Sequence, residues 1–254
     1  MKGIKLIVTD LDNTLLRRDK TVSSYTFDVF RRMRESGTLL AFATACDYRF
    51  VTEYLTPLTG IKPDILIADN GALARYNDKD LYLKMIPYTT VNNIKAIFER
   101  VRCVATERAL YLSSEYSINH WSVGKKATVI TDFSVGFDTD AFFLSGKFGK
   151  SSLPIINSYH DIRVVRYSDV NSMTVVHREA TKLNALFAVG SALDIAIDDI
   201  AVFGDDYSDL DVLLYYKHSI AVANAIDKCK AAANYVCCDC DEDGVAKWIE
   251  INVL

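Results

Sequence analysis

The chain has 254 residues, of which 50% are hydrophobic and 24% charged, and its formal net charge is −4. This composition is typical of a globular chain of one or two domains and excludes the collagen-like and disordered classes. A mildly acidic chain without a clustered basic face is not expected to bind nucleic acid, and no apolar run approaches the roughly 20 residues of a membrane span. The first ten residues lack a secretory pattern, so we expect a cytoplasmic protein whose six cysteines are free thiols.

The N-terminal third of the chain predicts alternating strands and helices. An apolar, β-branched run over 4–9 is typical of a strand buried on both faces. The pattern over 22–36 predicts a helix that is capped by Thr21 or Ser23 and ends at Gly37. The alternation continues with a strand over 39–43, a helix over 48–58 and a strand over 65–68. Alternation of this kind predicts a parallel sheet.

The C-terminal part repeats this alternation, whereas the middle of the chain differs from it. Helices are predicted over 181–193, 209–215, 227–233 and 244–251, and strands over 200–203, 219–222 and 235–237. In the middle we expect strands over 103–112, 128–131, 141–144, 162–167 and 173–177, and helices over 91–101 and 153–158. The fold class is therefore α/β: a Rossmann-like parallel-sheet core domain of residues 1–81 and 181–254, with an inserted α+β domain of residues 82–180.

Acidic residues follow two of the predicted strands. The run Asp10-Leu11-Asp12-Asn13-Thr14 follows the first strand, and Gly204-Asp205-Asp206-Tyr207-Ser208-Asp209 follows the strand over 200–203. Open α/β folds bind ligands at the carboxyl ends of their strands, and an all-oxygen site there favours Mg²⁺. The alternative is a pair of solvated turns that cap the next helices. Two such acidic runs together favour a cation site, because neighbouring carboxylates repel one another without a counter-charge.

Two further polar residues lie at the starts of predicted helices. Lys182 could neutralise phosphate oxygens or a nucleophilic carboxylate. Thr44 and the backbone amides after it could hold an oxyanion. The alternative for Lys182 is an exposed lysine on a helix surface. The alternative for Thr44 is an ordinary helix cap.

The four elements occur along the chain as Asp10-x-Asp12-x-Thr14, Thr44, Lys182 and Gly204-Asp205-x-x-x-Asp209. This order resembles the four motifs of haloacid dehalogenase-like (HAD) phosphatases, and the resemblance covers essentially the whole chain. The position of the insertion and three further segments are similar to the Cof-type sugar-phosphatase branch with its α/β cap domain. These segments are Asn70-Gly71-Ala72, Ala221-Val222-Ala223-Asn224-Ala225 and Asp243-Gly244-Val245.

The resemblance implies a phosphate monoester hydrolase that acts on a small phosphorylated metabolite through an aspartyl-phosphate intermediate. Asp10 would be the nucleophile, and Asp12 would be the general acid and then the general base. Residues that would bind the phosphate are Thr44, Ala45, Lys182 and Asn224. The implied cofactor is Mg²⁺, with ligands from Asp10, the Asp12 carbonyl, Asp205 and Asp209.

The chain departs from the family pattern at three places. Ala45-Cys46 stands where Gly-Arg usually follows the motif-two threonine, Asn13 replaces a glycine, and Ser208 replaces an asparagine but still offers an oxygen. Losing one charge-assisted contact of roughly 1.5–3 kcal/mol would weaken phosphate binding about ten- to a hundredfold, unless Arg49 compensates. Because the catalytic aspartates are retained, we expect an active enzyme.

Three other functions share parts of this pattern. A phosphotransferase or phosphomutase would use the same aspartyl-phosphate, and a weakened binding or regulatory protein could keep the fold with Cys46 in place of the arginine. A receiver domain also carries an aspartate on a parallel sheet, but the long insertion and the Asp10-x-Asp12 spacing argue against it. A dinucleotide-binding domain is not expected, because no G-x-G-x-x-G follows the first strand.

The inserted domain is expected to set the substrate and, by opening and closing, to gate its entry. A polar and aromatic patch in it would meet a leaving group or be ordinary surface; its residues are Asn119, His120, Trp121, Lys125 and Lys126. The expected partner is a small-molecule phosphate ester, with neither nucleic acid nor membrane, and the expected state is a monomer or weak homo-oligomer.

Overall fold

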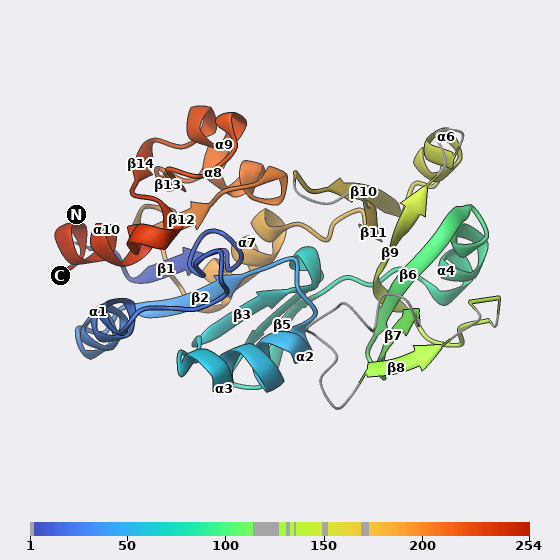
Figure 1. Ribbon diagram of the computed structural model, residues 1–254, viewed down its shortest axis with the longest axis horizontal. Helices are drawn as coiled ribbons and strands as arrows, with labels where there is room; N and C mark the ends of the chain where they lie inside the picture. The colour runs from blue at the N-terminus through green and yellow to red at the C-terminus, as the bar shows by residue number, and fades with distance from the viewer. Residues whose placement is uncertain (1–2, 114–126, 131–132, 135, 149–151, 169–172) are drawn as a thin grey trace.

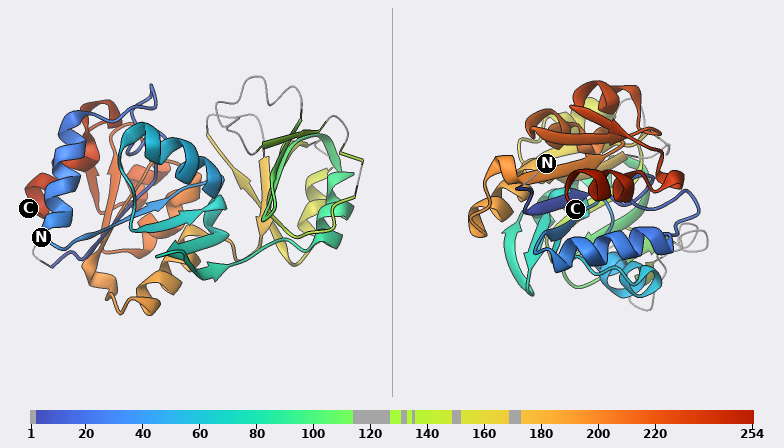
Figure 2. Two further views of the ribbon diagram at one scale, coloured as in Figure 1. Left: turned by 90° about the horizontal axis from the view of Figure 1, so that it is seen from below. Right: turned by 90° about the vertical axis from the view of Figure 1, so that its left-hand side faces the viewer.

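The computed structural model describes residues 3–113, 127–130, 133–134, 136–148, 152–168 and 173–254. Within these ranges the chain forms two sheets, each with its own helices and buried apolar cluster. Figure 1 shows the larger body with both chain termini and the smaller body beside it, and Figure 2 shows the narrow connection between them.

The larger sheet contains eight strands. In chain order these are β1 (Leu6–Thr9), β2 (Leu39–Ala43), β3 (Ile65–Ala68), β4 (Leu73–Tyr76), β5 (Lys79–Leu83), β12 (Ile200–Gly204), β13 (His218–Val222) and β14 (Tyr235–Cys237). They lie in the order β14-β13-β12-β1-β2-β3-β4-β5. The strands from β14 to β3 are parallel, and β4 and β5 are antiparallel additions. Every residue of β1 and β12 is buried, as in a strand covered on both faces.

The helices of this core begin and end close to their predicted limits. They are α1 (Ser24–Glu35), the continuous run α2 (Tyr48–Phe50), η1 (Val51–Leu55) and α3 (Thr56–Thr59), then α7 (Lys182–Ala192), α8 (Leu210–Tyr215), α9 (Asp227–Ala232) and α10 (Gly244–Asn252). Short 3₁₀ turns are η2 (Asp69–Gly71), η3 (Ile197–Asp199), η4 (Tyr207–Asp209) and η5 (Cys240–Glu242). Of the two candidate caps of α1, Ser23 accepts a hydrogen bond from the Thr26 amide, so Ser23 is the cap.

The smaller body has a six-stranded sheet with the order β10-β11-β9-β6-β7-β8. Its elements are α4 (Tyr88–Lys95), β6 (Phe98–Thr106), β7 (Leu110–Ser113), β8 (Ala127–Ile130), β9 (Ala141–Phe148), α6 (Ser152–Asn157), β10 (Ile162–Arg166) and β11 (Met173–His177). The pairings are antiparallel except between β7 and β8. The predicted fold, a parallel-sheet core with an inserted α+β cap, is therefore confirmed.

Two predicted elements differ in detail from the structure, and one hairpin was not predicted. The helix predicted over 91–101 ends with α4 at Lys95, and β6 begins at Phe98 with a mixed buried and exposed pattern. The strand predicted over 103–112 is two strands, β6 and β7, joined by a turn. The β4–β5 hairpin was not predicted; its turn is Asn77-Asp78, and both residues have positive φ, as a type I′ turn requires.

The patch at Asn119, His120, Trp121, Lys125 and Lys126 lies outside the described residues. Among the described residues, no helix has both the length and the apolarity that crossing a membrane requires. The core sheet ends with β5 at Leu83 and the core resumes with α7 at Lys182; the domain limits 1–81, 82–180 and 181–254 stay a prediction.

Candidate active site

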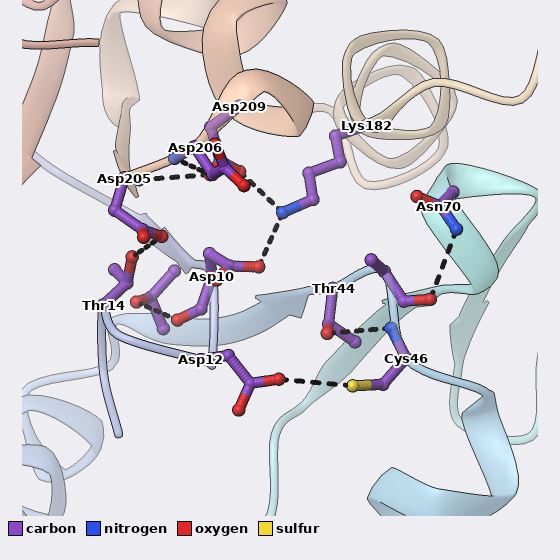
Figure 3. Close-up of polar contacts among 12 residues, drawn as sticks. Asp10, Asp12, Thr14, Thr44, Cys46, Asn70, Lys182, Asp205, Asp206 and Asp209 are labelled. Carbon is purple, nitrogen blue, oxygen red and sulfur yellow. Dashed lines mark hydrogen bonds and ion pairs between the residues drawn. The ribbon is translucent and has the colours of Figure 1, made fainter. Parts of the chain in front are cut away.

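The predicted site residues meet at the carboxyl edge of the core sheet. Asp10 follows β1, Thr44 follows β2 and Asp205 follows β12, and these three strands are neighbours. Lys182, the first residue of α7, reaches into the same place (Figure 3). Strand β1 has β2, the next strand in the chain, on one side and β12 on the other. The order of the strands therefore reverses at β1, and open α/β sheets bind ligands at such a switch point.

Lys182 lies between two aspartates in the centre of the site. Its Nζ contacts Asp10 Oδ1 and Asp209 Oδ1, both at 2.6 Å. The side chains of Lys182 and Asp209 are only 2% and 1% exposed. An ion cluster this deeply buried is costly to leave unpaired, so the lysine and the two carboxylates hold one another in place.

Burial and mutual repulsion shift the titration of these groups. Burial raises the pKa of Asp10 to about 7, although Lys182 opposes that rise. Burial and the charge of Asp10 raise the pKa of Asp205 to about 8. Burial lowers the pKa of Lys182, but the carboxylates of Asp10 and Asp209 outweigh it and hold the pKa above its usual value. Without a cation, the site therefore favours retention of a proton by its carboxyl groups.

The same carboxylates form a set that fits a metal ion. One oxygen each of Asp10, Asp205 and Asp209 lies within 4.8 Å of the others. Asp205 is 8% exposed, and its Oδ1 accepts a hydrogen bond from Thr14 Oγ1 at 2.7 Å. Hard, all-oxygen ligands of this kind favour Mg²⁺, so the residues present fit the cation that the family resemblance implies.

Asp209 also organises the loop after β12. Its Oδ2 accepts hydrogen bonds from the backbone N–H groups of Asp205 and Asp206, at 3.1 and 3.2 Å. A Cβ at Gly204 would lie 2.4 Å from Asp209 Cβ. Gly204 is therefore required by its close contact with Asp209.

Asp12 and Cys46 face each other across the other side of the site (Figure 3). Cys46 Sγ donates to Asp12 Oδ2 at 3.5 Å, and burial and the charge of Asp12 raise the pKa of this thiol well above its usual value. The Thr44 hydroxyl accepts from the Cys46 amide at 3.1 Å. The position of the usual arginine is thus taken by a neutral thiol that contacts Asp12.

Asparagines tie the loops of the site together. Asn70 Nδ2 donates to the carbonyl of Ala45 at 3.3 Å, which supports the loop after Thr44. Asn224 Nδ2 donates to the carbonyl of Asn13 at 2.6 Å, and its Oδ1 accepts from the Cys240 amide. These contacts make Asn224 a support for the first acidic loop; its predicted contact with phosphate stays a prediction.

The replacement of glycine by Asn13 is explained by its backbone. Asn13 has φ of 58°, in the left-handed region that glycine and asparagine adopt most readily. Asparagine is therefore tolerated where the family pattern has a glycine.

Arg49 does not fill the place of the missing arginine. Its guanidinium binds Asp47 and donates to the carbonyl of Thr106 in β6 at 2.9 Å. Its side chain is 8% exposed and packs over the Tyr48 ring. Arg49 thus joins the core to the second sheet.

Comparison with known proteins identifies the family of this chain. The profile of haloacid dehalogenase-like hydrolases matches residues 7–249. The chain belongs to this family. A relative in Bacillus subtilis, 5-amino-6-(5-phospho-D-ribitylamino)uracil phosphatase, is 25% identical over 270 residues, covering 96% of each chain.

Solved HAD structures share the whole fold of this HAD-like chain. The HAD subclass IIB sugar phosphatase BT4131 has a TM-score of 0.81 at 20% identity and covers 97% of this chain and 98% of its own. BT1666 from Bacteroides thetaiotaomicron has a TM-score of 0.80 at 19% identity, with 98% and 94% covered. The predicted family and the prediction of an enzyme, a HAD-like phosphatase, are confirmed.

One residue of the site was missed by the sequence reasoning. Lys20 Nζ contacts Asp12 Oδ1 at 2.8 Å. Its only sequence signal is its position eight residues after Asp12 in a short polar stretch, which does not distinguish it from a surface lysine.

Proposed function

We propose that this HAD-like phosphatase hydrolyses small phosphate monoesters through an aspartyl-phosphate on Asp10. The observation that carries the proposal is the buried contact of Asp10 with Lys182 beside Asp205, at the carboxyl edge of the sheet. A carboxylate held there in one orientation is prepared for in-line attack on phosphorus. The new Asp10–phosphorus bond forms as the bond from phosphorus to the leaving oxygen breaks.

The other residues take roles that follow from their places. Lys182 and the loop of Thr44 and Ala45 would bind the phosphoryl oxygens, since an ammonium and backbone amides stabilise negative charge. Asp12 would protonate the leaving oxygen and then accept a proton from the water that cleaves the aspartyl-phosphate, help typically worth about 10²–10⁴ in rate. Mg²⁺ held by Asp10, Asp205, the Asp12 carbonyl and Asp209 would offset repulsion between carboxylate and phosphate.

We further propose a substrate of the sugar-phosphate kind, in which the leaving group meets the cap. The Bacillus subtilis relative acts on a phosphorylated ribityl compound, and BT4131 is a sugar phosphatase. Free cysteines throughout the described chain are compatible with the cytoplasm.

The test is phosphate release from a panel of sugar phosphates, nucleotides and an aryl phosphate. It is run with Mg²⁺, with EDTA and with Asp10→Asn; Asp80→Asn, a surface aspartate paired with Arg75, is the matched control. Metal-dependent release that is lost in Asp10→Asn and kept in Asp80→Asn supports the proposal. Phosphoryl transfer to an added alcohol in place of water would identify a phosphotransferase, and no turnover by folded protein would indicate a binding role.

A further inference from the structure

The carboxylate of Asp12 is held at both of its oxygens. Lys20 Nζ contacts Oδ1 at 2.8 Å, and Cys46 Sγ donates to Oδ2 at 3.5 Å. The side chains of Lys20 and Asp12 are 35% and 34% exposed, so the pair lies at the rim of the site and not in its buried centre. Two donors on one carboxylate restrict its rotation far more than one does.

A tight turn of the backbone positions Lys20 beside Asp12. The Lys20 N–H donates to the carbonyl of Arg17 at 2.8 Å, and the Arg17 N–H donates to the carbonyl of Thr21 at 3.0 Å. Lys20 has φ of 67°, in the left-handed region that residues other than glycine rarely adopt. Such a conformation persists only where the surroundings determine it.

The turn is stabilised by ion pairs of Arg17 and Arg18 with the loop before α10. Arg17 Nη2 binds Asp243 at 2.8 Å, and Asp243 also accepts from Thr26. Arg18 binds Asp239 and Asp241, so the acidic group at 239–241 already has a cation of the chain. The turn is therefore fixed to the core by Arg17 and Arg18, which gives the ammonium of Lys20 a defined position.

We propose that Lys20 is a positioning residue for Asp12, holding its carboxylate in the orientation from which it serves the leaving oxygen. This inference rests on the proposed function. The two lysines of the site contact different carboxylates. Lys182 contacts Asp10 and Asp209, and Lys20 contacts Asp12. Lys20 acts on the acid–base group, whereas Lys182 acts on the nucleophile.

The inference predicts a dependence on the leaving group. A poor leaving group, such as an alkoxide, needs a proton from Asp12 as the bond to phosphorus breaks, whereas a nitrophenolate leaves without one. Lys20→Met should therefore lower kcat/KM for alkyl phosphates about 10- to 100-fold and change it for p-nitrophenyl phosphate by no more than about twofold. The parameter kcat/KM is used because it reports the steps up to departure of the leaving group.

The experiment compares Lys20→Met, Lys20→Arg, Asp12→Asn and the double variant Lys20→Met/Asp12→Asn on a series of esters with graded leaving groups. Lys5→Met is the matched control, because Lys5 forms a similar 2.7 Å pair with Asp199 outside the site. We expect a steeper dependence on leaving-group pKa in Lys20→Met, partial recovery in Lys20→Arg, and no more than about a twofold further loss when Lys20→Met is added to Asp12→Asn.

Each other result has a defined meaning. An equal loss for all leaving groups, or a loss that multiplies with that of Asp12→Asn, would overturn the inference and make Lys20 a contact of the substrate or of the fold. Lys20→Gln, which keeps a donor without the charge, replaces Lys20→Met if the latter fails to fold. If the unaltered enzyme releases no phosphate from any ester, the proposed function fails instead.

Discussion

The buried carboxyl groups predict that the metal-free protein loses stability as the pH rises from about 5 to about 7. Burial raises the pKa of Asp10 to about 7 and that of Asp205 to about 8. In the unfolded chain both groups lose their protons near pH 4. Between these values the folded state binds more protons than the unfolded state, so the free energy of unfolding falls with rising pH.

The size of the effect follows from the two residues. A pKa difference of one unit corresponds to about 1.4 kcal/mol. Asp10 and Asp205 are 7% and 8% exposed, so solvent screens them little. If the two neighbouring groups together retain one proton, the free energy of unfolding should fall by about 2–3 kcal/mol over these two pH units.

The assay is urea unfolding in EDTA at intervals across this range, repeated with excess Mg²⁺. A bound cation would take the place of the retained proton, so Mg²⁺ should raise the stability most at the upper end of the range. Asp205→Asn, which removes one of the two carboxyl groups, should show a shallower slope. The comparison with this variant cancels the contribution of His177, whose pKa burial lowers. Stability in EDTA that is constant, or that rises relative to the variant, would refute the reasoning.

Four further outcomes are expected. Asp10→Asn should lower turnover roughly 10³-fold or more in protein that remains folded; retention of more than a few percent of activity would contradict its role as nucleophile. Cys46→Arg should lower KM for simple phosphate esters about tenfold or more, and an unchanged KM would count against a missing phosphate contact. Gly71→Ala should destabilise the fold by about 2–4 kcal/mol, measured by urea unfolding, because its Cβ would lie 2.3 Å from the Thr181 carbonyl group. X-ray scattering should show a more compact shape with a phosphate analogue than without; one unchanged shape would count against gating by the cap.

The strands of the core could be predicted because strands that are buried on both faces consist of short runs of apolar residues. The runs over 6–9, 39–43 and 200–204 are buried almost completely, and each ends where a polar residue of the site begins. Neighbouring parallel strands place their carboxyl ends at one edge, so residues far apart in the sequence could be expected to meet. For this reason the sequence predicts that Asp10, Thr44 and Asp205 lie at the same edge of the sheet.

The position of Lys20 could not be predicted in this way. It depends on the left-handed backbone of one residue and on ion pairs such as Arg17–Asp243, which join segments 226 residues apart. Neither leaves a pattern of apolar residues. The contacts of Arg49 could not be predicted either. Its partner Asp47 is close in the sequence, but the carbonyl of Thr106 belongs to the inserted sheet.

Two of the contacts between the cap and the core fall on loops that build the site. The Tyr167 hydroxyl, just after β10, donates to Asn70 Oδ1 at 2.8 Å, and Asn70 in turn supports the carbonyl of Ala45. The Ser168 amide donates to Asp206 at 2.9 Å, beside the metal-binding candidate Asp205. One short segment of the cap thus contacts Asp206 in the loop after β12 directly, and reaches the loop after Thr44 through Asn70. Movement of the cap away from the core would break these two contacts together, so the position of the cap and the order of both loops are linked by geometry.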